Sequence, residues 1–244
     1  MGIKVSYFDN YEEFSAQAAQ IVKAELAKKP DAVLGLPTGS TPVGMYKKLI
    51  EMNKNGEINF SKVRTFNLDE YFPIKRESEQ SYYKFMFDIF FDHVNIKHEN
   101  INIPNGESAN PDLDCGRYDE KIDNAGGIDL MVLGIGANGH IGFNEPGDFL
   151  VSGTHVAALA EDTIKVNARF FNSADEVPKQ ALSMGMGSII AKSRKILLLV
   201  SGESKREVFK QFLSGGKIST TNPATFLYLH NDVTIISDVI IINN

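Results

Sequence analysis

The sequence predicts an α/β fold: a doubly wound, mostly parallel sheet with helices on both faces, the three-layer arrangement of Rossmann-like proteins. Short apolar runs typical of buried strands alternate with longer segments whose apolar residues recur at helical spacing. The 244 residues suit one large α/β domain, and hydrophobic and charged contents of 43% and 23% are ordinary for a globular chain. Because no internal repeat or low-complexity linker interrupts the alternation, we expect residues 1–244 to form a single domain.

The expected strands are short apolar runs bounded by glycine, proline or charged residues. The run at 128–135 is apolar apart from Asp129, as in strands of a parallel sheet that are buried on both faces. In chain order, the expected strands cover residues 3–8, 31–36, 63–68, 128–135, 154–159, 195–200 and 233–236, with a continuation of the last to 242 left open.

The expected helices begin at capping residues and carry an apolar stripe. Asn10 with Glu13 forms a capping-box pattern, and Pro42 and Pro111 stand where a first helical residue is expected. The aromatic residues of segment 81–93 are interpreted as core, because such side chains are usually buried. The helices are expected from Asn10 to Lys28, from Pro42 to Met52, over 81–93, 111–124, 161–171 and 177–191, and from about Lys205 onward.

Composition excludes several classes of function. A net charge of −6, a pI near 5.4 and the lack of a basic run argue against a nucleic-acid-binding protein. The single cysteine, Cys115, rules out an internal disulfide and suits a reducing compartment; we interpret it as a passive helix residue. With no signal-peptide pattern and no apolar stretch of membrane-spanning length, we expect a cytoplasmic protein that binds neither membrane nor nucleic acid. The five histidines show no metal-ligand spacing, so no metal is expected.

The glycine-rich segment after the expected strand 128–135 is the first candidate site. Gly134, Gly136 and Gly139 match the G-x-G-x-x-G pattern of dinucleotide-binding proteins, which requires a helix to begin at the third glycine. Two more glycines and a proline within 140–147 exclude that helix, so no dinucleotide cofactor is expected. Because ligands bind at the carboxyl ends of strands in such sheets, we expect half of an active site here. Its polar side chains are Asn138, His140, Asn144 and Glu145.

Two further strand ends carry polar loops. The loop 37–42 offers backbone N–H groups, hydroxyls and a helix start, which together suit an anion; an ordinary turn and helix cap is the alternative. It lacks the lysine of a P-loop, so a nucleoside triphosphate is not expected. Asp69 and Glu70 end the strand 63–68. Adjacent acids usually form a solvated turn, but their place beside the other loops favours a functional role.

The polar loops and their flanking residues resemble the motifs of a known family, the glucosamine-6-phosphate deaminases. The resemblance rests on three motifs in order, at residues 36–42, 67–71 and 134–147, and extends over the whole chain through 168–171 and 200–205. The resemblance implies conversion of glucosamine 6-phosphate and water into fructose 6-phosphate and ammonia, with no metal and no organic cofactor.

The resemblance also implies roles for single residues. Asp69 matches the base that removes the proton at C2 of the sugar, and His140 matches the group that opens the sugar ring. Asn138 and Glu145 match the residues that orient His140 and tune its charge. In many relatives an aspartate stands at this position. Asn138 is neutral, so it does not supply the negative charge that an aspartate would bring to His140.

The remaining matched positions concern the substrate. Arg169 and Lys205 match phosphate ligands, and residues 163–181 resemble a mobile lid that closes over the site. The full expected substrate-binding set is Pro37, Thr38, Gly39, Ser40, Thr41, Glu70, Gly136, Arg169 and Lys205.

The sequence departs from those relatives that are activated by N-acetylglucosamine 6-phosphate at subunit interfaces. Where these relatives have serine, arginine and lysine, this chain has Asp148, His155 and Ala157. An aspartate repels a phosphate and an alanine offers it no donor. We therefore expect no activation by that ligand, hyperbolic kinetics, and a monomer or small homo-oligomer.

Two alternatives remain at this stage. A 6-phosphogluconolactonase would share the fold and the sugar-phosphate site, but residues 68–71 and 144–146 fit the deaminase better. A sugar-phosphate-sensing regulator would not need Asp69, His140 and Glu145 together. Such a regulator usually carries a DNA-binding module, and the sequence has no basic footprint of one.

Overall fold

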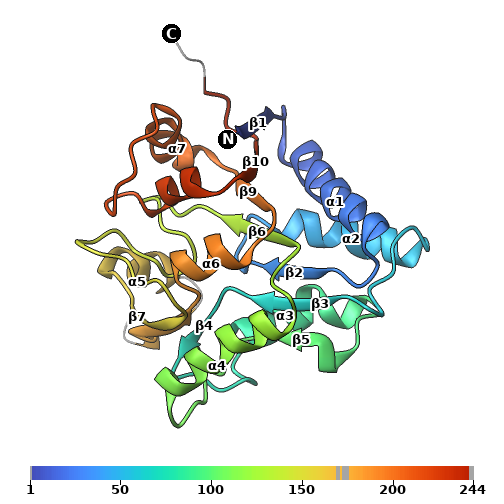
Figure 1. Ribbon diagram of the computed structural model, residues 1–244, viewed down its shortest axis with the longest axis horizontal. Coiled ribbons are helices and arrows are strands. Elements are labelled where there is room, and N and C mark those ends of the chain that lie inside the picture. Colours follow the sequence, from blue (N-terminus) through green and yellow to red (C-terminus); the bar gives the residue numbers. More distant parts are fainter. Residues whose placement is uncertain (1, 169–170, 172–175, 242–244) are drawn as a thin grey trace.

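The computed structural model describes residues 2–168, 171 and 176–241. Its centre is a seven-stranded sheet in which every neighbouring pair is parallel (Figure 1). This confirms the predicted α/β class with a doubly wound parallel sheet. The strands in spatial order are β1 (Gly2–Tyr7), β10 (Asp232–Ser237), β9 (Ile196–Val200), β6 (Leu130–Gly134), β2 (Val33–Leu36), β3 (Arg64–Asn67) and β5 (Ile101–Asn102).

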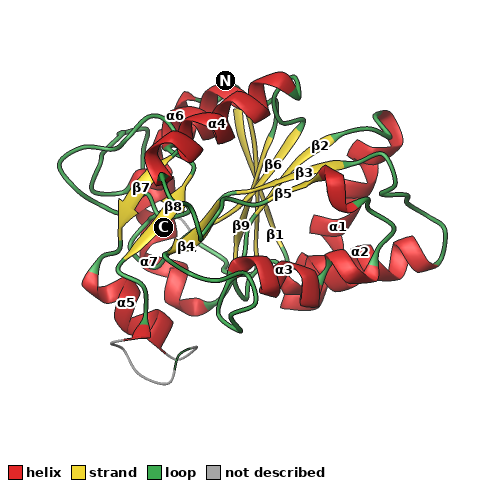
Figure 2. Cartoon of the chain, turned by 90° about the horizontal axis from the view of Figure 1, so that it is seen from below, coloured by secondary structure: helices red, strands yellow, loops and turns green. Residues whose placement is uncertain are grey.

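Helices cover both faces of this sheet, and each face has its own apolar core (Figure 2). Along β6, Met131 and Leu133 pack into one core while Leu130 and Val132 pack into the other, because successive strand side chains point to opposite faces. One core packs against α4, α6 and α7, the other against α1, α2 and α3. The helices are α1 (Tyr11–Lys28), α2 (Val43–Lys54), α3 (Tyr82–Ile89), α4 (Pro111–Asn124), α5 (Glu161–Asn167), α6 (Met186–Lys192) and α7 (Arg206–Leu213).

The helix starts expected at Asn10 and Asn110 are confirmed by their caps. The Asn10 side chain accepts a hydrogen bond from the Glu13 backbone N–H at 2.9 Å and donates to the Glu13 carboxylate at 3.1 Å. These bonds satisfy groups that a helix end would otherwise leave unpaired. Asn110 caps α4 in the same way, accepting from the Leu113 N–H at 3.3 Å.

A second, antiparallel sheet of three strands lies beside the large one, and the sequence analysis did not predict it as a sheet. Its strands are β4 (Asp69–Phe72), β8 (Gln180–Ser183) and β7 (His155–Ala158), in that spatial order. The predicted strand 154–159 is therefore confirmed, but it belongs to this small sheet. Asp69 and Glu70, expected in a loop, are strand residues.

The predicted helix 177–191 is confirmed from Met186 onward as α6 and is wrong before that residue. Residues 180–183 are extended because they pair with β4 on one side and β7 on the other, and this pairing outweighs local helix propensity. Helix α6 begins only after Gly185, where a Cβ would come within 2.3 Å to 2.5 Å of the carbonyl oxygens of residues 151–153. A close backbone approach, invisible in the local sequence, therefore decides where the helix starts.

Other element boundaries also differ from the expectations. The segment 81–93 divides into α3 and a 3₁₀ turn, η1 (Phe91–His93), because Phe90 leaves helical geometry with φ near −141°. Helix α5 is shorter than the predicted 161–171. Strand β10 ends at Ser237, whose hydroxyl accepts the Val239 N–H and turns the chain, so the strand does not continue to 242. The remaining short elements are η2 (His98–Asn100), η5 (Glu203–Lys205) and η6 (Pro223–Leu229).

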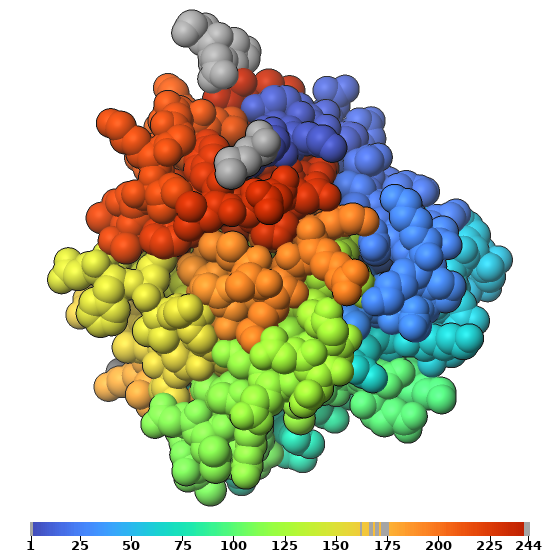
Figure 3. Space-filling view, viewed as in Figure 1, coloured from blue at the N-terminus to red at the C-terminus, as the bar shows by residue number. Residues whose placement is uncertain are grey.

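The first and last strands of the chain lie side by side, since β1 pairs in parallel with β10 (Figure 3). Between the two edges, the strand order changes direction. From β2 the chain proceeds outward to β3, whereas β6 and β9 lie on the other side of β2. In doubly wound sheets, a ligand crevice forms at this point, beyond the carboxyl ends of the strands. Among the described residues, no helix is both long and apolar enough to cross a lipid bilayer.

Candidate active site

The candidate site lies where four segments leave adjacent parallel strands. The loops 201–205, 135–147 and 37–42 follow β9, β6 and β2, whereas β3 leads through Leu68 directly into β4. Because β9, β6, β2 and β3 are neighbours and parallel, all four segments begin at one edge of the sheet. The loops that the sequence singled out separately are therefore brought together by the topology.

The loop 135–147 contains turns and no helix, so the G-x-G-x-x-G pattern does not have the geometry of a dinucleotide site. Gly139 and Gly142 adopt φ values of 89° and 57°, which other residues rarely adopt. Gly136 has a different role: a Cβ added there would lie 2.3–2.4 Å from three ring atoms of His140. The face of the imidazole therefore rests against the Gly136 backbone.

Glu145 holds the polar side chains of this loop together. Its Oε2 accepts a hydrogen bond from Asn138 Nδ2 at 2.8 Å and lies 3.4 Å from Nδ1 of His140, while Oε1 accepts the Thr163 hydroxyl at 2.5 Å. Burial acts to raise the pKa of Glu145, but the contacts with His140, Thr163 and Asn138 outweigh it, and the pKa is lowered. The group is therefore a carboxylate facing an imidazole.

Asn138 contacts His140 differently from our expectation. Its Oδ1 accepts the backbone N–H of His140 at 3.1 Å, and its amide donates to Glu145. Because an N–H faces Oδ1 and a carboxylate faces Nδ2, both partners agree on the orientation of the amide. Glu145, rather than Asn138, faces the imidazole ring, and Asn138 positions both of its neighbours.

Asp69, the first residue of β4, reaches the same loop from the other side. Its Oδ2 lies 3.2 Å from the position that a Cβ on Gly142 would occupy, two residues after His140. Ser183, its partner in β8, contacts the same position and also binds the Phe143 N–H through its hydroxyl. Burial, together with the charge of Glu70, raises the pKa of Asp69 to about 8. A carboxyl group with a pKa near neutrality suits reversible proton transfer.

Glu70 points away from this loop. Its carboxylate accepts the backbone N–H groups of Tyr71, Tyr82 and Tyr83, each at 2.8 Å, and so caps the start of α3. Burial raises the pKa of Glu70 to about 7, and these three donors oppose the rise. Expected from the sequence as a substrate ligand, Glu70 has the contacts of a residue that positions α3.

Aromatic side chains line the space between the loops. The Tyr82 ring lies 4.8 Å from Tyr71 and stacks on Phe143 at 6.1 Å, with an interplanar angle of 5°. Burial raises the pKa of the Tyr82 hydroxyl well above its usual value, although a hydrogen bond with the Thr38 side chain opposes the rise. Of the aromatic residues expected in the core, Phe90 and Phe91 are fully buried there. Tyr82 packs on the cluster of Tyr71 and Phe143 and also joins loop 37–42 to the Asp69 side of the site.

The expected anion-binding residues have backbone geometry that suits the role. In loop 37–42, Gly39 adopts a φ of 98°, and Gly39 and Ser40 are exposed. The Tyr11 hydroxyl accepts the Gly44 N–H at 2.9 Å and lies 3.1 Å from the Ser40 carbonyl oxygen, which braces the loop. Pro37 is buried, and its carbonyl oxygen accepts the Tyr46 hydroxyl at 2.6 Å.

Of the other two expected phosphate ligands, the structure describes only Lys205. Lys205 ends η5, half-buried, in the loop after β9, and therefore lies on the same sheet edge as loop 37–42. Arg169 lies outside the described residues, as does part of the expected lid 163–181.

Asn222 belongs to a segment that the sequence analysis did not consider. Its side chain is buried, and its Oδ1 lies 2.3 Å from the position of a Cβ on Gly139 and has no hydrogen bond to any described residue. The Ala224 N–H donates to the Gly139 carbonyl and the Gly147 N–H to the Thr220 carbonyl, at 2.9 Å and 3.2 Å. The one sequence signal near Asn222 is the Asn-Pro pair that it forms with the next residue. Such a pair indicates a turn and not a functional side chain.

Asn144, expected among the chemistry-bearing side chains, instead supports the loop. Its amide donates to the carbonyl oxygens of Ile141 and Met184, both at 2.8 Å. These bonds tie the loop to the end of β8, next to Asp69.

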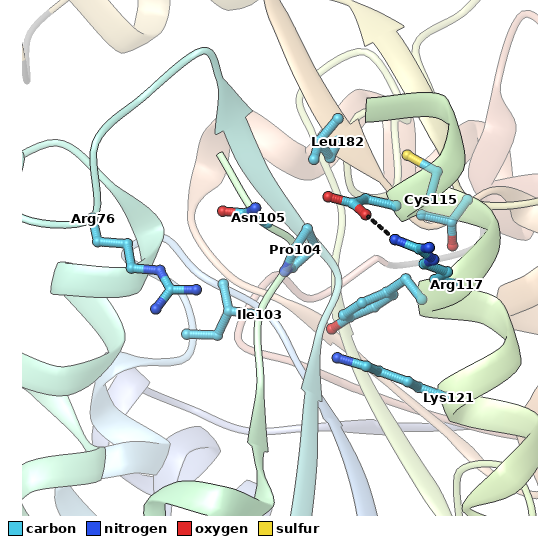
Figure 4. Close-up of a pocket in the computed structure, with 11 residues that line it drawn as sticks. Arg76, Ile103, Pro104, Asn105, Cys115, Arg117, Lys121 and Leu182 are labelled. Carbon is cyan, nitrogen blue, oxygen red and sulfur yellow. Dashed lines mark hydrogen bonds and ion pairs between the residues drawn. The ribbon is translucent and has the colours of Figure 1, made fainter. Parts of the chain in front are cut away.

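A separate cleft of about 320 Å³ is lined in part by Leu182 of the small sheet (Figure 4). Successive side chains on a strand point to opposite faces, so this cleft lies on the face of the small sheet opposite to the one on which Ser183 contacts the candidate site. Arg76 and Lys121 point toward it from opposite sides. Burial raises the pKa of the Cys115 thiol here to about 12, in keeping with the expectation of a passive cysteine.

Within the part of the chain that the structure describes, no group of three or more His, Cys, Asp or Glu side chains is arranged to hold a metal ion. The chemistry that the described site can perform is proton transfer by Asp69 and by the His140–Glu145 pair.

The chain matches known proteins over nearly its whole length. The family model described as glucosamine-6-phosphate isomerases/6-phosphogluconolactonase matches residues 9–236. Proteins named glucosamine-6-phosphate deaminase from Thermoanaerobacter sp. (strain X514) and Clostridium botulinum (strain Langeland) are 56% and 52% identical to the chain over 236 residues. These alignments cover 97% of this chain and 92% and 96% of the two relatives.

Solved structures extend the comparison. A structure described as a monomeric glucosamine-6-phosphate deaminase has a TM-score of 0.93 and 46% identity, covering 96% of this chain and 97% of that one. A 6-phosphogluconolactonase from Thermotoga maritima has a TM-score of 0.74 at 19% identity, covering 97% and 99%. The second likeness shows a shared fold.

Proposed function

Since the chain belongs to the family of glucosamine-6-phosphate isomerases and 6-phosphogluconolactonases, we propose that it converts glucosamine 6-phosphate and water into fructose 6-phosphate and ammonia. One observation carries the proposal beyond family membership. A buried carboxyl group, Asp69, lies against the glycine-rich loop that carries a carboxylate-paired imidazole, His140. An isomerising deamination needs two such proton-transferring groups around one sugar.

The proposed mechanism assigns one proton transfer to each group. His140, with Glu145 behind it, exchanges a proton with the ring oxygen and opens the sugar. Asp69 removes the proton from C2 of the open chain, and the same proton or another is returned at C1. Water then attacks the imine carbon at C2, and ammonia leaves as the ketone forms.

An amino sugar suits the raised pKa of Asp69. In the free protein, burial favours the protonated form of this carboxyl group, which cannot act as a base. The ammonium group on C2 of the substrate would bring a positive charge next to Asp69. That charge would lower the pKa of Asp69 and produce the carboxylate where it is needed. A sugar without the amine lacks this effect.

The phosphate group is proposed to bind at loop 37–42 and Lys205, with Arg169 as a further ligand by resemblance. The residues offered by the loop are Pro37, Thr38, Gly39, Ser40 and Thr41, with the Gly136 backbone beside His140. The part of the expected lid 163–181 that lies between Thr163 and strand β8 would exclude water on closing. We further propose that the protein acts as a monomer or small oligomer in the cytoplasm. The likeness to a monomeric deaminase and the single cysteine support this.

The test is an assay of purified protein with glucosamine 6-phosphate, in which ammonium and fructose 6-phosphate are measured separately. We expect both products in equal amounts, and Asp69→Asn should reduce their formation by about 10²–10⁴-fold. A parallel assay with 6-phosphogluconolactone tests the alternative of the sequence analysis. Lactone hydrolysis without ammonium release would replace the proposal with that alternative. Binding of the sugar phosphate without turnover would indicate the regulator.

A further inference from the structure

The Glu145 carboxylate is held by contacts from two different parts of the chain. Oε2 faces Asn138 and His140, which belong to its own loop. Oε1 accepts the hydroxyl of Thr163, a buried residue of α5, at 2.5 Å. Each oxygen therefore has a separate partner, and the partner of Oε1 comes from the segment that follows β7.

The orientation of this carboxylate decides what His140 contacts. Nδ1 of His140 is buried and makes no hydrogen bond with a described residue; its polar neighbour is Oε2 of Glu145, at 3.4 Å. The last torsion of a glutamate is broad, so a carboxylate held at one oxygen alone can turn part of the way about that torsion. A turned carboxylate would leave Nδ1 of His140 without its partner.

We propose that Thr163 is a positioning residue for the acid–base pair: its hydroxyl fixes the Glu145 carboxylate so that Oε2 faces Nδ1 of His140. The inference rests on the proposed deaminase activity, in which this pair opens the sugar ring. Thr163 is itself held in place, because the neighbouring Ile164 packs on the aromatic cluster of Tyr71 and Phe143. The start of α5 has no side-chain cap, so these contacts are important in fixing its position.

The proposed role of Thr163 predicts a change in the pH dependence of kcat. Hydrogen bonds from Thr163 and Asn138 and the contact with His140 together lower the pKa of Glu145 against the effect of burial. Among the described residues, the titratable group facing the carboxylate is His140. On α5, Glu161 and Lys165 are exposed and lie 3.9 Å apart, and the packed segment 218–224 carries no titratable side chain. Loss of the Thr163 hydroxyl should therefore raise the pKa of Glu145 and move the acidic limb of kcat to higher pH.

The experiment compares two substitutions at Thr163 with a matched threonine elsewhere. Thr163→Val removes the hydroxyl and keeps the shape, and Thr163→Ser keeps the hydroxyl. The control is Thr154→Val. Thr154 is also buried and donates to a carboxylate, that of Asp119, at 2.9 Å, but it lies on the far side of the small sheet.

We expect Thr163→Val to lower kcat about tenfold with little change in KM, which matches the loss of one hydrogen bond to a charged group. Its acidic limb should move to higher pH. Thr163→Ser should restore most of kcat, and Thr154→Val should keep the kcat and pH profile of the unchanged protein. When Glu145 is already replaced by glutamine, Thr163→Val should lower kcat by a smaller factor, because Thr163 acts through the Glu145 carboxylate.

Each outcome is decisive for one proposal. Absence of ammonium release from the unchanged protein would refute the deaminase activity itself. If the unchanged protein is active and Thr163→Val retains its kcat and pH profile, the role of Thr163 is refuted and the deaminase stands. Equal losses in Thr163→Val and Thr163→Ser would also refute it. Circular dichroism monitors folding, and Thr163→Ala serves as the hydroxyl-free variant if Thr163→Val unfolds.

Discussion

The face of the His140 imidazole rests on the backbone of Gly136, where a Cβ would lie 2.3 Å from the nearest ring atom. Real side-chain contacts are never this short, so any residue larger than glycine at 136 must displace the ring. The ring also lies beside Glu145, with Nδ1 at 3.4 Å from Oε2 of that carboxylate. A glycine two residues into the loop therefore sets where the imidazole lies.

Gly136→Ala should lower kcat by about 10²-fold or more, because the displaced imidazole can no longer transfer a proton in the required geometry. The measurement is steady-state ammonium release, with thermal unfolding recorded beside it. Gly134→Ala is the matched control: a Cβ on Gly134 meets no atom within 4 Å, and its activity should be close to that of the unchanged protein. Equal activities for the two variants would contradict the placement of His140.

Asp69→Asn should flatten the dependence of stability on pH. Burial, with the charge of Glu70, raises the pKa of Asp69 from 3.8 to about 8, so between these values the folded protein holds a proton that the unfolded chain has released. The stability that this proton confers is complete below the unfolded pKa and is lost as pH rises through the folded pKa. The variant lacks this loss and should gain stability relative to the unchanged protein as pH rises.

Urea unfolding at a series of pH values across that window measures the effect, and Asp31→Asn, at an exposed aspartate, is the control. Because burial also raises the pKa of Glu70, to about 7, some pH dependence should persist in Asp69→Asn. Parallel stability curves for the variant and the unchanged protein would show that Asp69 is ionised in the folded state at all these pH values.

Glu70→Gln should destabilise the fold by about 1–3 kcal/mol, because an amide group would replace one of the oxygens that accept three backbone N–H groups at the start of α3. The measurement is urea unfolding above pH 7, where the unchanged side chain is ionised. Glu79→Gln, with its side chain 76% exposed, should change stability by less than about 0.5 kcal/mol. A change in KM without a change in stability would return Glu70 to the role of substrate ligand.

The rate should depend hyperbolically on substrate concentration, and N-acetylglucosamine 6-phosphate should not activate the protein. Asp148 is exposed and would repel a phosphate, and Ala157 is 5% exposed and offers no donor. Light scattering after size-exclusion chromatography should give the mass of a monomer or small oligomer. A sigmoidal rate curve that becomes hyperbolic on adding the effector would overturn this prediction.

The polar loops could be located from the sequence because their signals are local. Buried strands appear as apolar runs, and glycines and capping residues mark where each run ends. The strands of the large sheet other than β5, and the caps at Asn10 and Asn110, followed from this reasoning. The helix expected over 177–191 failed because residues 180–183 are extended by pairing with β4 and β7, two strands far away in the sequence. Local propensity contains no information about such partners.

The sequence by itself determined that Asp69, Glu70, His140 and Glu145 stand at strand ends, where an α/β sheet gathers its chemistry. Only the tertiary structure decided which of the two adjacent acids faces the imidazole loop. Asp69 pairs with Ser183 and Glu70 with Leu182, and neighbours along a strand point to opposite faces. Only folding brought the Thr163 hydroxyl to Glu145. The register between strands and the packing of a distant helix are properties of the whole chain, so no local pattern could specify them.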